Sequence, residues 1–287
     1  METIFQRVGI IGVGLLGGAL GHRLAVMGWE VLGHDPAVPS VDGLKMCANA
    51  TELAGQCELI LLSLPTSDIA VKVVDALGQT VNEQHCFIDT TTGEPGEMEA
   101  LGHALAGHGA TYLEANVAGS SELAKCGEVS LFLGGSTETI DRCQVLLQDL
   151  AAKRFHVGPV GAASRFKLIH NLILGLNRAA LAEGLALAEA LGFDAADLVE
   201  ILRETPATSA ALEAKGEKMA KADYEPPQAR LAQHLKDVRL IRQLADRAGA
   251  NTPLSSVHQS LLESAESLGF GGVDNAAVIE ALRRGNL

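Results

Sequence analysis

Three glycines near the start of the chain constrain its fold more than any other feature. Gly12, Gly14 and Gly17 have G-x-G-x-x-G spacing and separate an apolar run, residues 8–11, from a helix-like segment, residues 15–27. In this pattern the first glycine permits a tight turn out of a strand, the second leaves room for a pyrophosphate, and the third lets the helix pack closely. The helix N-terminus then offers free N–H groups to phosphates. The predicted dinucleotide contacts are Gly12, Gly14, Leu15, Leu16 and Gly17.

A carboxylate follows the glycines at the spacing of a ribose ligand. Residues 30–34 are predicted to form a second strand that ends at Asp35, 18 residues after Gly17, close to the ~20 typical of a ribose-binding acid. A carboxylate there accepts hydrogen bonds from the ribose hydroxyls of NAD and repels the 2′-phosphate of NADP. No cation occurs between Asp35 and Lys45, so the sequence favours NAD over NADP. The alternatives are a glycine-rich packing turn in another α/β protein and, for Asp35, an ordinary turn residue.

Composition narrows the class of protein further. The chain has 287 residues, of which 47% are hydrophobic, so two domains with substantial cores are expected. The formal net charge of −13 argues against nucleic acid as a partner, because nucleic-acid binding needs a basic face. Five cysteines without C-x-x-C spacing indicate buried thiols in a reducing cytoplasm rather than a disulfide framework. Nine histidines without ligand spacing predict no metal site, and no apolar run reaches the ~20 residues that span a membrane.

The two halves of the chain have different patterns. Strand-like and helix-like segments alternate through residues 1–161, which predicts a Rossmann-type, doubly wound parallel sheet, an α/β fold. The predicted strands are residues 8–12, 30–34, 59–63, 86–89, 111–114, 129–133 and 153–157. The predicted helices of this half include residues 15–27, 67–77, 95–106 and 137–151.

Residues 162–287 show no strand pattern and predict an all-helical domain. Residues 162–191 form one long helix-like run, which at 1.5 Å per residue is ~45 Å, more than one compact domain needs. We expect this helix to join the domains and to bury a face against another subunit, in a homodimer or homotetramer. The later helices are predicted at residues 194–204, 231–248, 253–268 and 275–284.

Four further segments stand where strands end or where the long helix begins. Leu64-Pro65-Thr66 follows the third predicted strand, and residues 89–95 (DTTTGEP) follow the fourth. Residues 114–121 (EANVAGSS) follow the fifth strand, and residues 167–171 (KLIHN) lie early on the long helix. Open α/β sheets bind ligands at the carboxyl ends of their strands. These segments are therefore the candidates for the site.

Taken together, the segments resemble the β-hydroxyacid dehydrogenase family, which includes 3-hydroxyisobutyrate dehydrogenase and tartronate semialdehyde reductase and belongs to the 6-phosphogluconate dehydrogenase superfamily. The family pattern D-x-S-T-x-x-P is matched by residues 89–95, and D-A-P-V-S-G-G by residues 114–120. Gly158, Gly161, Lys167 and Asn171 match its G-x-G-x-x-x-K-x-x-x-N with slightly different spacing. A late Lys236-Asp237 pair and a final helix led by Asp274 complete a resemblance that covers nearly the whole chain.

The resemblance implies an NAD(P)-dependent oxidoreductase acting on a small β-hydroxy acid or semialdehyde. Lys167 and Asn171 are four residues apart, so they share one face of a helix. Hydride transfer at a carbonyl carbon also requires a proton on the oxygen, and a partly desolvated lysine beside a cationic nicotinamide ring suits that transfer. By resemblance, Lys167 is the proton donor and acceptor, and Asn171 holds the substrate and the lysine in register.

Other residues are assigned by the same resemblance. Those expected at the cofactor are Leu64, Pro65, Thr66, Thr92 and Lys236. An exposed helical lysine is the alternative for Lys236, and local backbone bonding in a loop is the alternative for Pro65 and Thr92. Those expected at the substrate are Asn116, Ala118, Gly119, Ser120 and His170. For His170, which points about 100° away from Asn171 on an ideal helix, substrate contact and ordinary packing remain equal alternatives.

The chain departs from the family pattern at two informative positions. Ala118 stands where the family has a serine whose hydroxyl receives the substrate carboxylate, so a substrate other than 3-hydroxyisobutyrate is expected. We hypothesise that Asn116, Ser120 and Arg230 supply the polar groups of an altered substrate pocket. Leu174 replaces the glutamate of decarboxylating relatives, which disfavours decarboxylation. An imine reductase and a catalytically silent NAD(P)-binding scaffold are the alternative functions, and Lys167 argues against both.

Overall fold

The structure, a computed structural model, describes residues 7–284. It contains two compact units, Met1–Lys167 and Leu168–Leu287, which are described separately below. The predicted boundary lay at residues 161 and 162, before the long helix. The observed boundary falls inside that helix, α8 (Ala162–Ala190), so its first turns pack with the N-terminal unit.

The N-terminal unit is built on one eight-stranded sheet with the order β3-β2-β1-β4-β5-β6-β7-β8. Its strands are β1 (Arg7–Ile11), β2 (Glu30–His34), β3 (Lys45–Met46), β4 (Leu59–Leu62), β5 (Cys86–Asp89), β6 (Thr111–Ala118), β7 (Ser130–Gly134) and β8 (Lys153–Gly158). The strands pair in parallel except for β6 and β7, so the prediction of a wholly parallel sheet was wrong at this pair. Only residues 119–129 connect β6 with β7, and a parallel crossover needs a dozen or more.

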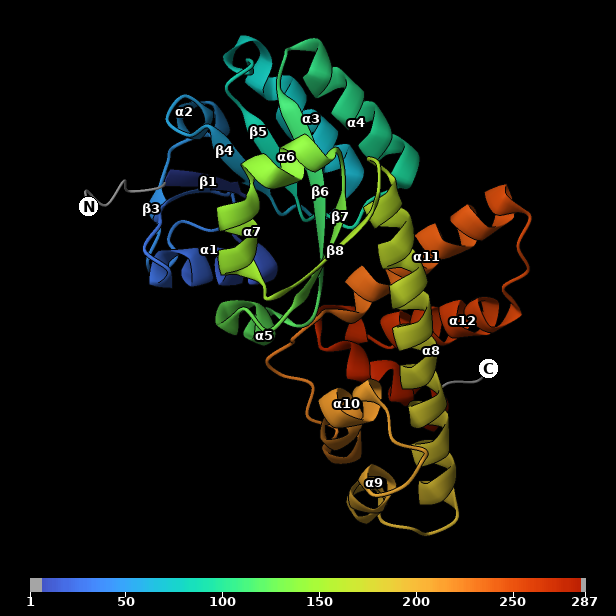
Figure 1. Ribbon diagram of the computed structural model, residues 1–287. Helices are drawn as coiled ribbons and strands as arrows, with labels where there is room; N and C mark the ends of the chain where they lie inside the picture. The colour runs from blue at the N-terminus through green and yellow to red at the C-terminus, as the bar shows by residue number, and fades with distance from the viewer. Residues whose placement is uncertain (1–6, 285–287) are drawn as a thin grey trace. The chain divides into compact units, whose positions relative to one another are not determined.

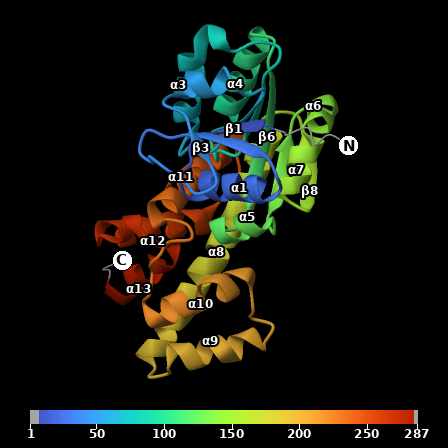
Figure 2. The ribbon, with the colours of Figure 1, turned by 90° about the vertical axis from the view of Figure 1, so that its left-hand side faces the viewer.

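Helices cover both faces of this sheet, as expected for a doubly wound fold (Figure 1). One apolar core lies between the sheet and α1 (Leu15–Val26), α5 (Ser121–Cys126), α6 (Thr137–Arg142) and α7 (Gln144–Leu150). The other lies between the sheet and α2 (Ala50–Ala54), α3 (Ser67–Leu77) and α4 (Pro95–Gly107). Helices α1 and α5 lie side by side in two perpendicular views (Figures 1 and 2). The β1–α1–β2 unit therefore supplies the strand, glycine turn and helix that the sequence predicted.

Several short elements were not predicted from the sequence. They are β3, α2, α5 and, in the C-terminal unit, α10 (Ala210–Lys221). The predicted helix 137–151 is divided at Cys143, which ends α6 and precedes α7. Segments of two to six residues carry too little periodicity to be detected, whereas polar helices such as α10 lack an apolar stripe strong enough to distinguish them from loops.

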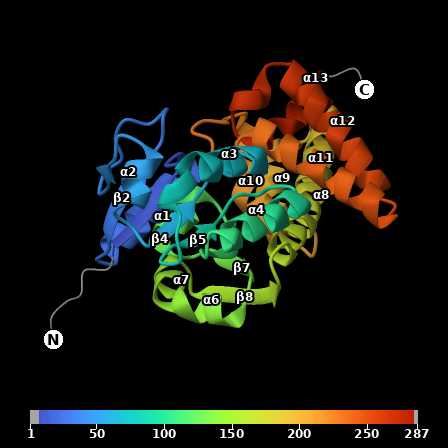
Figure 3. The same cartoon turned by 90° about the horizontal axis from the view of Figure 1, so that it is seen from above.

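Helices joined by loops make up the described residues of the C-terminal unit, with one isolated β-bridge between Arg230 and Asp274. After α8 come α9 (Ala195–Arg203), α10, α11 (Leu231–Ala248), α12 (Pro253–Ser267) and α13 (Glu280–Arg284), with the short helices η2 (Phe270–Gly272) and η3 (Asn275–Ile279) before α13. Helices α11 and α12 lie side by side (Figures 1 and 3). The predicted helix 275–284 is thus a 3-10 segment followed by one α-helical turn.

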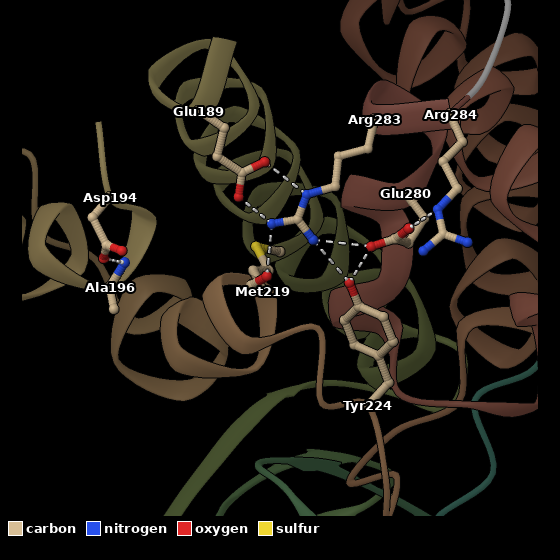
Figure 4. Close-up of polar contacts among 8 residues, drawn as sticks. All are labelled: Glu189, Asp194, Ala196, Met219, Tyr224, Glu280, Arg283 and Arg284. Carbon is tan, nitrogen blue, oxygen red and sulfur yellow. Dashed lines mark hydrogen bonds and ion pairs between the residues drawn. The ribbon is translucent and has the colours of Figure 1, made fainter. Parts of the chain in front are cut away.

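A half-buried arginine joins the end of this unit to its long helix. Arg283 of α13 binds both carboxylate oxygens of Glu189 on α8, and its Nη1 lies 2.9 Å from Glu280 Oε1 (Figure 4). The Tyr224 hydroxyl donates to the same Glu280 oxygen at 2.6 Å. Because an Arg–carboxylate fork fixes both partners in orientation, this network sets how α13 lies against α8 within the unit.

Candidate functional site

The glycine turn has the geometry that its spacing predicted. Gly12 has a φ of +90°, and a Cβ atom there would collide with the carbonyl oxygen of Ser63. A Cβ on Gly17 would collide with the carbonyl oxygen of Gly12, so only glycine allows α1 to approach this closely. At Gly14 a Cβ would meet no atom within 4 Å, and no side chain caps α1. Open space therefore lies beside the uncapped N-terminus of α1, where a phosphate would be bound.

Asp35 follows β2 and is half-buried beside the glycine turn. Its Oδ2 accepts a hydrogen bond from Val13 N at 3.0 Å, and its Oδ1 accepts one from Ala37 N at 2.8 Å. The carboxylate is thus fixed next to the loop where the sequence placed it. The same contacts show that it also stabilises the turn, which is the alternative role considered above.

The loops after β4 and β5 are held together by a buried aspartate. Asp89 accepts hydrogen bonds from Thr91 N at 2.8 Å and from the Tyr112 hydroxyl at 3.0 Å. Leu64 N in turn donates to Thr91 Oγ1 at 3.1 Å. Burial raises the pKa of Asp89 to about 6 even though both hydrogen bonds oppose the rise. The buried Asp89 therefore fixes the beginning of the loop that carries the predicted cofactor residue Thr92.

The predicted cofactor residues of these loops lie at one edge of the sheet. Leu64 and Thr66 are half-buried between β4 and α3, with exposed Pro65 between them. Thr92 is half-buried in the loop between β5 and α4. All four follow the carboxyl ends of parallel strands, which is where such sheets bind ligands.

The predicted substrate loop begins later than expected. The sequence ended the strand at Glu114, but β6 continues to Ala118, so Asn116 and Ala118 belong to the strand. Asn116 is fully buried, and its Nδ2 donates to Thr91 O at 2.8 Å. Gly119 is exposed, and Ser120 caps α5 by accepting a hydrogen bond from Leu123 N at 3.3 Å. Ala118 offers no side-chain donor here.

The fully buried Glu114 binds the beginning of α8. One carboxylate oxygen accepts hydrogen bonds from Gly161 N at 2.6 Å and Ala163 N at 3.3 Å, and the other binds the backbone and hydroxyl of Ser164. A carboxylate at a helix N-terminus satisfies donors that otherwise have no partner and complements the helix dipole. Burial nevertheless raises the pKa of Glu114. This contact fixes the helical turn that directly precedes Lys167.

Lys167 and Asn171 lie one turn apart on α8, as predicted, and both are buried. In the C-terminal unit, Asn171 Nδ2 donates to Asp237 Oδ2 at 2.9 Å, and Lys236 Nζ lies 3.0 Å from Asp237 Oδ1. Asp237 thus orients the amide of Asn171 and pairs with the predicted cofactor residue Lys236. His170 Nδ1 lies 3.1 Å from Asn171 Oδ1, so the imidazole contacts the amide of its neighbour.

Sequence reasoning missed the three buried carboxylates that hold these residues in place. Asp89, Glu114 and Asp237 all occur inside motifs that were recognised, but none was assigned a role. Their signal is the same in each case, because an acid within an apolar strand or helix face must find donors when it is buried. Arg230, considered for the substrate pocket, is exposed at the beginning of α11.

The residues present fit a dinucleotide and show no metal centre. The glycine turn, the uncapped helix and the adjacent carboxylate offer complementary groups for a pyrophosphate and a ribose. Among residues 7–284 no group of three or more His, Cys, Asp or Glu side chains is placed to hold a metal ion. Within the same residues no helix is both long and apolar enough to cross a membrane.

Family comparisons match both parts of the chain. Residues 7–158 match the NAD-binding domain of 6-phosphogluconate dehydrogenase, and residues 161–282 match the NAD-binding family of NADP-dependent 3-hydroxyisobutyrate dehydrogenase. The chain belongs to the β-hydroxyacid dehydrogenase family. It is therefore an oxidoreductase that uses a nicotinamide cofactor, and the predicted fold class and family are confirmed.

Relatives of this β-hydroxyacid dehydrogenase extend over its whole length. Glyoxylate/succinic semialdehyde reductase 1 of Arabidopsis thaliana is 29% identical and covers 97% of this chain and 99% of its own. 2-(Hydroxymethyl)glutarate dehydrogenase of Eubacterium barkeri is 26% identical over 96% and 94% of the two chains. The crystal structure of 3-hydroxyisobutyrate dehydrogenase from Salmonella typhimurium matches this chain with a TM-score of 0.88 and 24% sequence identity. The match covers 96% of this chain and 99% of that one. Structures with the same fold also include an NADP+ complex and imine reductases.

Proposed function

We propose that the protein transfers a hydride between NAD(H) and a small β-hydroxy acid or the matching semialdehyde, with Lys167 as the proton donor and acceptor. The observation that carries the proposal is the placement of Lys167 one turn before Asn171 on α8, with both side chains buried. When bound, the nicotinamide cofactor supplies or accepts the hydride. Lys167 delivers a proton to the carbonyl oxygen of a semialdehyde, or removes it from the hydroxyl group of an acid.

Neighbouring side chains support this role for Lys167. Glu114 fixes the first turn of α8, and Asp237 directs the amide of Asn171 by accepting from its Nδ2. The Asn171 carbonyl oxygen is thereby left to accept hydrogen bonds from His170, a substrate hydroxyl or an amine. Burial excludes water from the amine and amide, which strengthens the hydrogen bonds that they make.

We also propose that NAD is preferred over NADP. Asp35 presents a carboxylate beside the glycine turn, and no cation follows it until Lys45 in β3. A carboxylate disfavours a 2′-phosphate by electrostatic repulsion. We propose further contacts to the cofactor from Leu64, Pro65, Thr66, Thr92 and Lys236.

The substrate is proposed to differ from 3-hydroxyisobutyrate. Ala118 removes the hydroxyl that other family members use for the substrate carboxylate, whereas Gly119 and Ser120 keep backbone donors at the end of β6. The names of the two relatives above point to semialdehydes and hydroxymethyl-substituted diacids as the compounds to try first. If Ala118→Ser leaves the substrate profile unchanged, this part of the proposal is wrong.

A spectrophotometric screen followed by substitution of Lys167 tests the proposal. Semialdehydes, β-hydroxy acids and cyclic imines are offered with NAD(H) and NADP(H), and we expect turnover of the first two classes with a preference for NAD(H). Lys167→Ala should reduce kcat by about 10²–10⁴-fold, the contribution typical of a general acid, while cofactor affinity is retained. Lys125→Ala, an exposed lysine on α5, is the control and should keep full activity.

Three outcomes would contradict the proposal. Turnover of cyclic imines alone would identify an imine reductase, a function found on the same fold. Cofactor binding without turnover of any compound would indicate a silent scaffold. Full activity of Lys167→Ala would remove the proton-transfer role from this lysine.

A further inference from the structure

Two cysteines of the N-terminal unit form a thiol pair that the proposed function does not use. Cys86 begins β5 and Cys143 stands between α6 and α7, and their sulfur atoms lie 3.2 Å apart although the residues are 57 positions apart in the chain. Both side chains are almost completely buried. A disulfide has an S–S length of about 2.05 Å, so an approach of about 1.2 Å would join them.

The surroundings favour a thiolate at Cys86. The hydrogen bond shared with Cys143 lowers the pKa of Cys86, and Thr111 and the positive charge of Arg142 act in the same direction against the effect of burial. The pKa of Cys143 is raised by the same hydrogen bond and by burial. The pair thus combines a nucleophilic sulfur with a protonated partner, which is the arrangement of a reactive dithiol.

The other cysteines provide an internal contrast. Burial raises the pKa of Cys57 to about 12 and also raises that of Cys47, so both are protonated at neutral pH. Cys126 is exposed on α5. Burial, thiolate character and a sulfur partner therefore occur together only at Cys86 among the five cysteines, all of which lie in the described part of the chain.

A hollow lies beside residues that neighbour the pair in the fold. It measures about 500 Å³ and lies between α4, the beginning of β6 and α6, with Ala110, Thr111 and Thr139 in its lining. Thr111 is the cross-strand partner of Cys86, and Thr139 O accepts the hydrogen bond from Cys143 N. The hollow is thus lined by one backbone neighbour of each cysteine.

We propose that Cys86 and Cys143 are a redox-active dithiol that a hydroperoxide, such as hydrogen peroxide, converts into an intramolecular disulfide. The Cys86 thiolate attacks one peroxide oxygen, so that an S–O bond forms, the O–O bond breaks and hydroxide leaves. The Cys143 sulfur then displaces the hydroxyl group from Cys86 as the S–S bond forms, and its proton leaves in water. In total, two thiols are oxidised by two electrons and one peroxide is reduced to two waters.

The disulfide would link the beginning of β5 to the junction of α6 and α7. Such a cross-link restrains the unfolded chain over a long segment and so stabilises the folded unit. It lies at the amino end of β5, opposite the end that carries Asp89 and the loop with Thr92. We therefore expect the oxidised form to be more resistant to heat.

Mass mapping of the native full-length protein tests this inference. The reduced protein is treated with hydrogen peroxide without denaturant, free thiols are alkylated, and the protein is digested. We expect a peptide pair joined through Cys86 and Cys143 that has lost two hydrogen atoms, is separated by dithiothreitol, and accompanies an increase of several degrees in Tm.

Substitutions identify the sulfur atoms responsible. Cys86→Ala and Cys143→Ala should each abolish the cross-link, whereas Cys57→Ala, a matched buried cysteine, should retain it. Circular dichroism shows whether each variant is folded. The peptide mapping of the natural protein tests the proposal even if a variant fails to fold. Oxidation confined to Cys126, or cross-linking that appears only in denaturant, would overturn the proposal.

Discussion

At the scale of single residues, buried carboxylates position the groups to which the sequence assigned chemistry. Asp89 organises the loop of Thr92, Glu114 binds the beginning of α8, and Asp237 orients Asn171. Asp89 and Glu114 each accept several hydrogen bonds, and Asp237 accepts one from Asn171 and pairs with Lys236. These contacts offset the cost of removing a charge from water. For Asp89 and Glu114 the hydrogen bonds do not fully offset the cost of burying the charge, because burial still raises their pKa values.

The raised pKa of Asp89 predicts a specific pH dependence of stability. A carboxyl group whose pKa is about 6 when folded and 3.8 in its ordinary state binds its proton more tightly in the folded protein. Its contribution therefore favours folding as the pH falls from about 6 to about 4, and reaches about 3 kcal/mol. Asp89→Asn should lack this contribution.

Urea unfolding of both proteins between pH 4 and 7.5 measures the difference. The free energy of unfolding of the natural protein, relative to that of Asp89→Asn, should increase as the solution is acidified. Subtraction of the variant removes the opposite contributions of other acids, such as Asp274, whose pKa is lowered. A difference that stays constant with pH would contradict the assignment.

At the scale of elements, the contact between β6 and α8 connects the sheet to the helix with Lys167. Glu114 lies in the middle of β6 and accepts hydrogen bonds from the first turn of α8. The strand thereby determines where this helix begins, and the helix period places Lys167 one turn later. The family motif around residue 114 can therefore be understood as structural support for the lysine.

Glu114→Gln should weaken this support. The amide offers one acceptor where the carboxylate offers two oxygens, so donors at the beginning of α8 are left without partners. We expect a loss of about 1–3 kcal/mol in the free energy of unfolding and a reduced kcat with little change in cofactor affinity.

Urea unfolding and steady-state kinetics measure the two effects. Glu122→Gln is the control, since Glu122 is exposed in the first turn of α5 and pairs with the exposed Lys125. Equal effects of the two substitutions would show that Glu114 has no special role in fixing α8.

At the scale of the whole molecule, an apolar stripe on α8 supports the proposal that the protein is a homodimer or homotetramer. Ile169, Ile173 and Leu187 are 53%, 55% and 61% exposed, and Leu191, which follows the helix, is 67% exposed. Their spacings of four and fourteen residues place them along one face of the helix. Exposed apolar side chains in such a row are typical of a surface that a second copy covers.

Ile173→Glu combined with Leu187→Glu should dissociate this assembly. Charged groups in an apolar interface are desolvated without partners, so association becomes unfavourable. Sedimentation velocity should show a multiple of the 29.9 kDa chain mass for the natural protein and one chain mass for the double variant. Val145→Glu, at an exposed apolar position of α7, is the control. A natural protein that sediments as a single chain would refute the prediction.

Features that depend on local physics could be predicted from the order of residues alone. Gly12, Gly14 and Gly17 act through backbone geometry, and the spacing of Lys167 and Asn171 acts through the period of the helix. Both patterns can therefore be recognised from residue spacing in the sequence. The same holds for the alternation of strands and helices and for the family resemblance, which the comparisons confirm.

Contacts between distant groups became evident only once the chain was seen folded. The contact of Glu114 with α8, the partnership of Asn171 with Asp237 and the Cys86–Cys143 pair each join segments far apart in the chain. The antiparallel direction of the β6–β7 pair likewise appears only in the folded sheet. Their formation depends on how strands and helices pack in space, and buried polar groups take whichever partners that packing brings within hydrogen-bond distance. The spacing of residues in the sequence does not give the distances between groups that packing brings together.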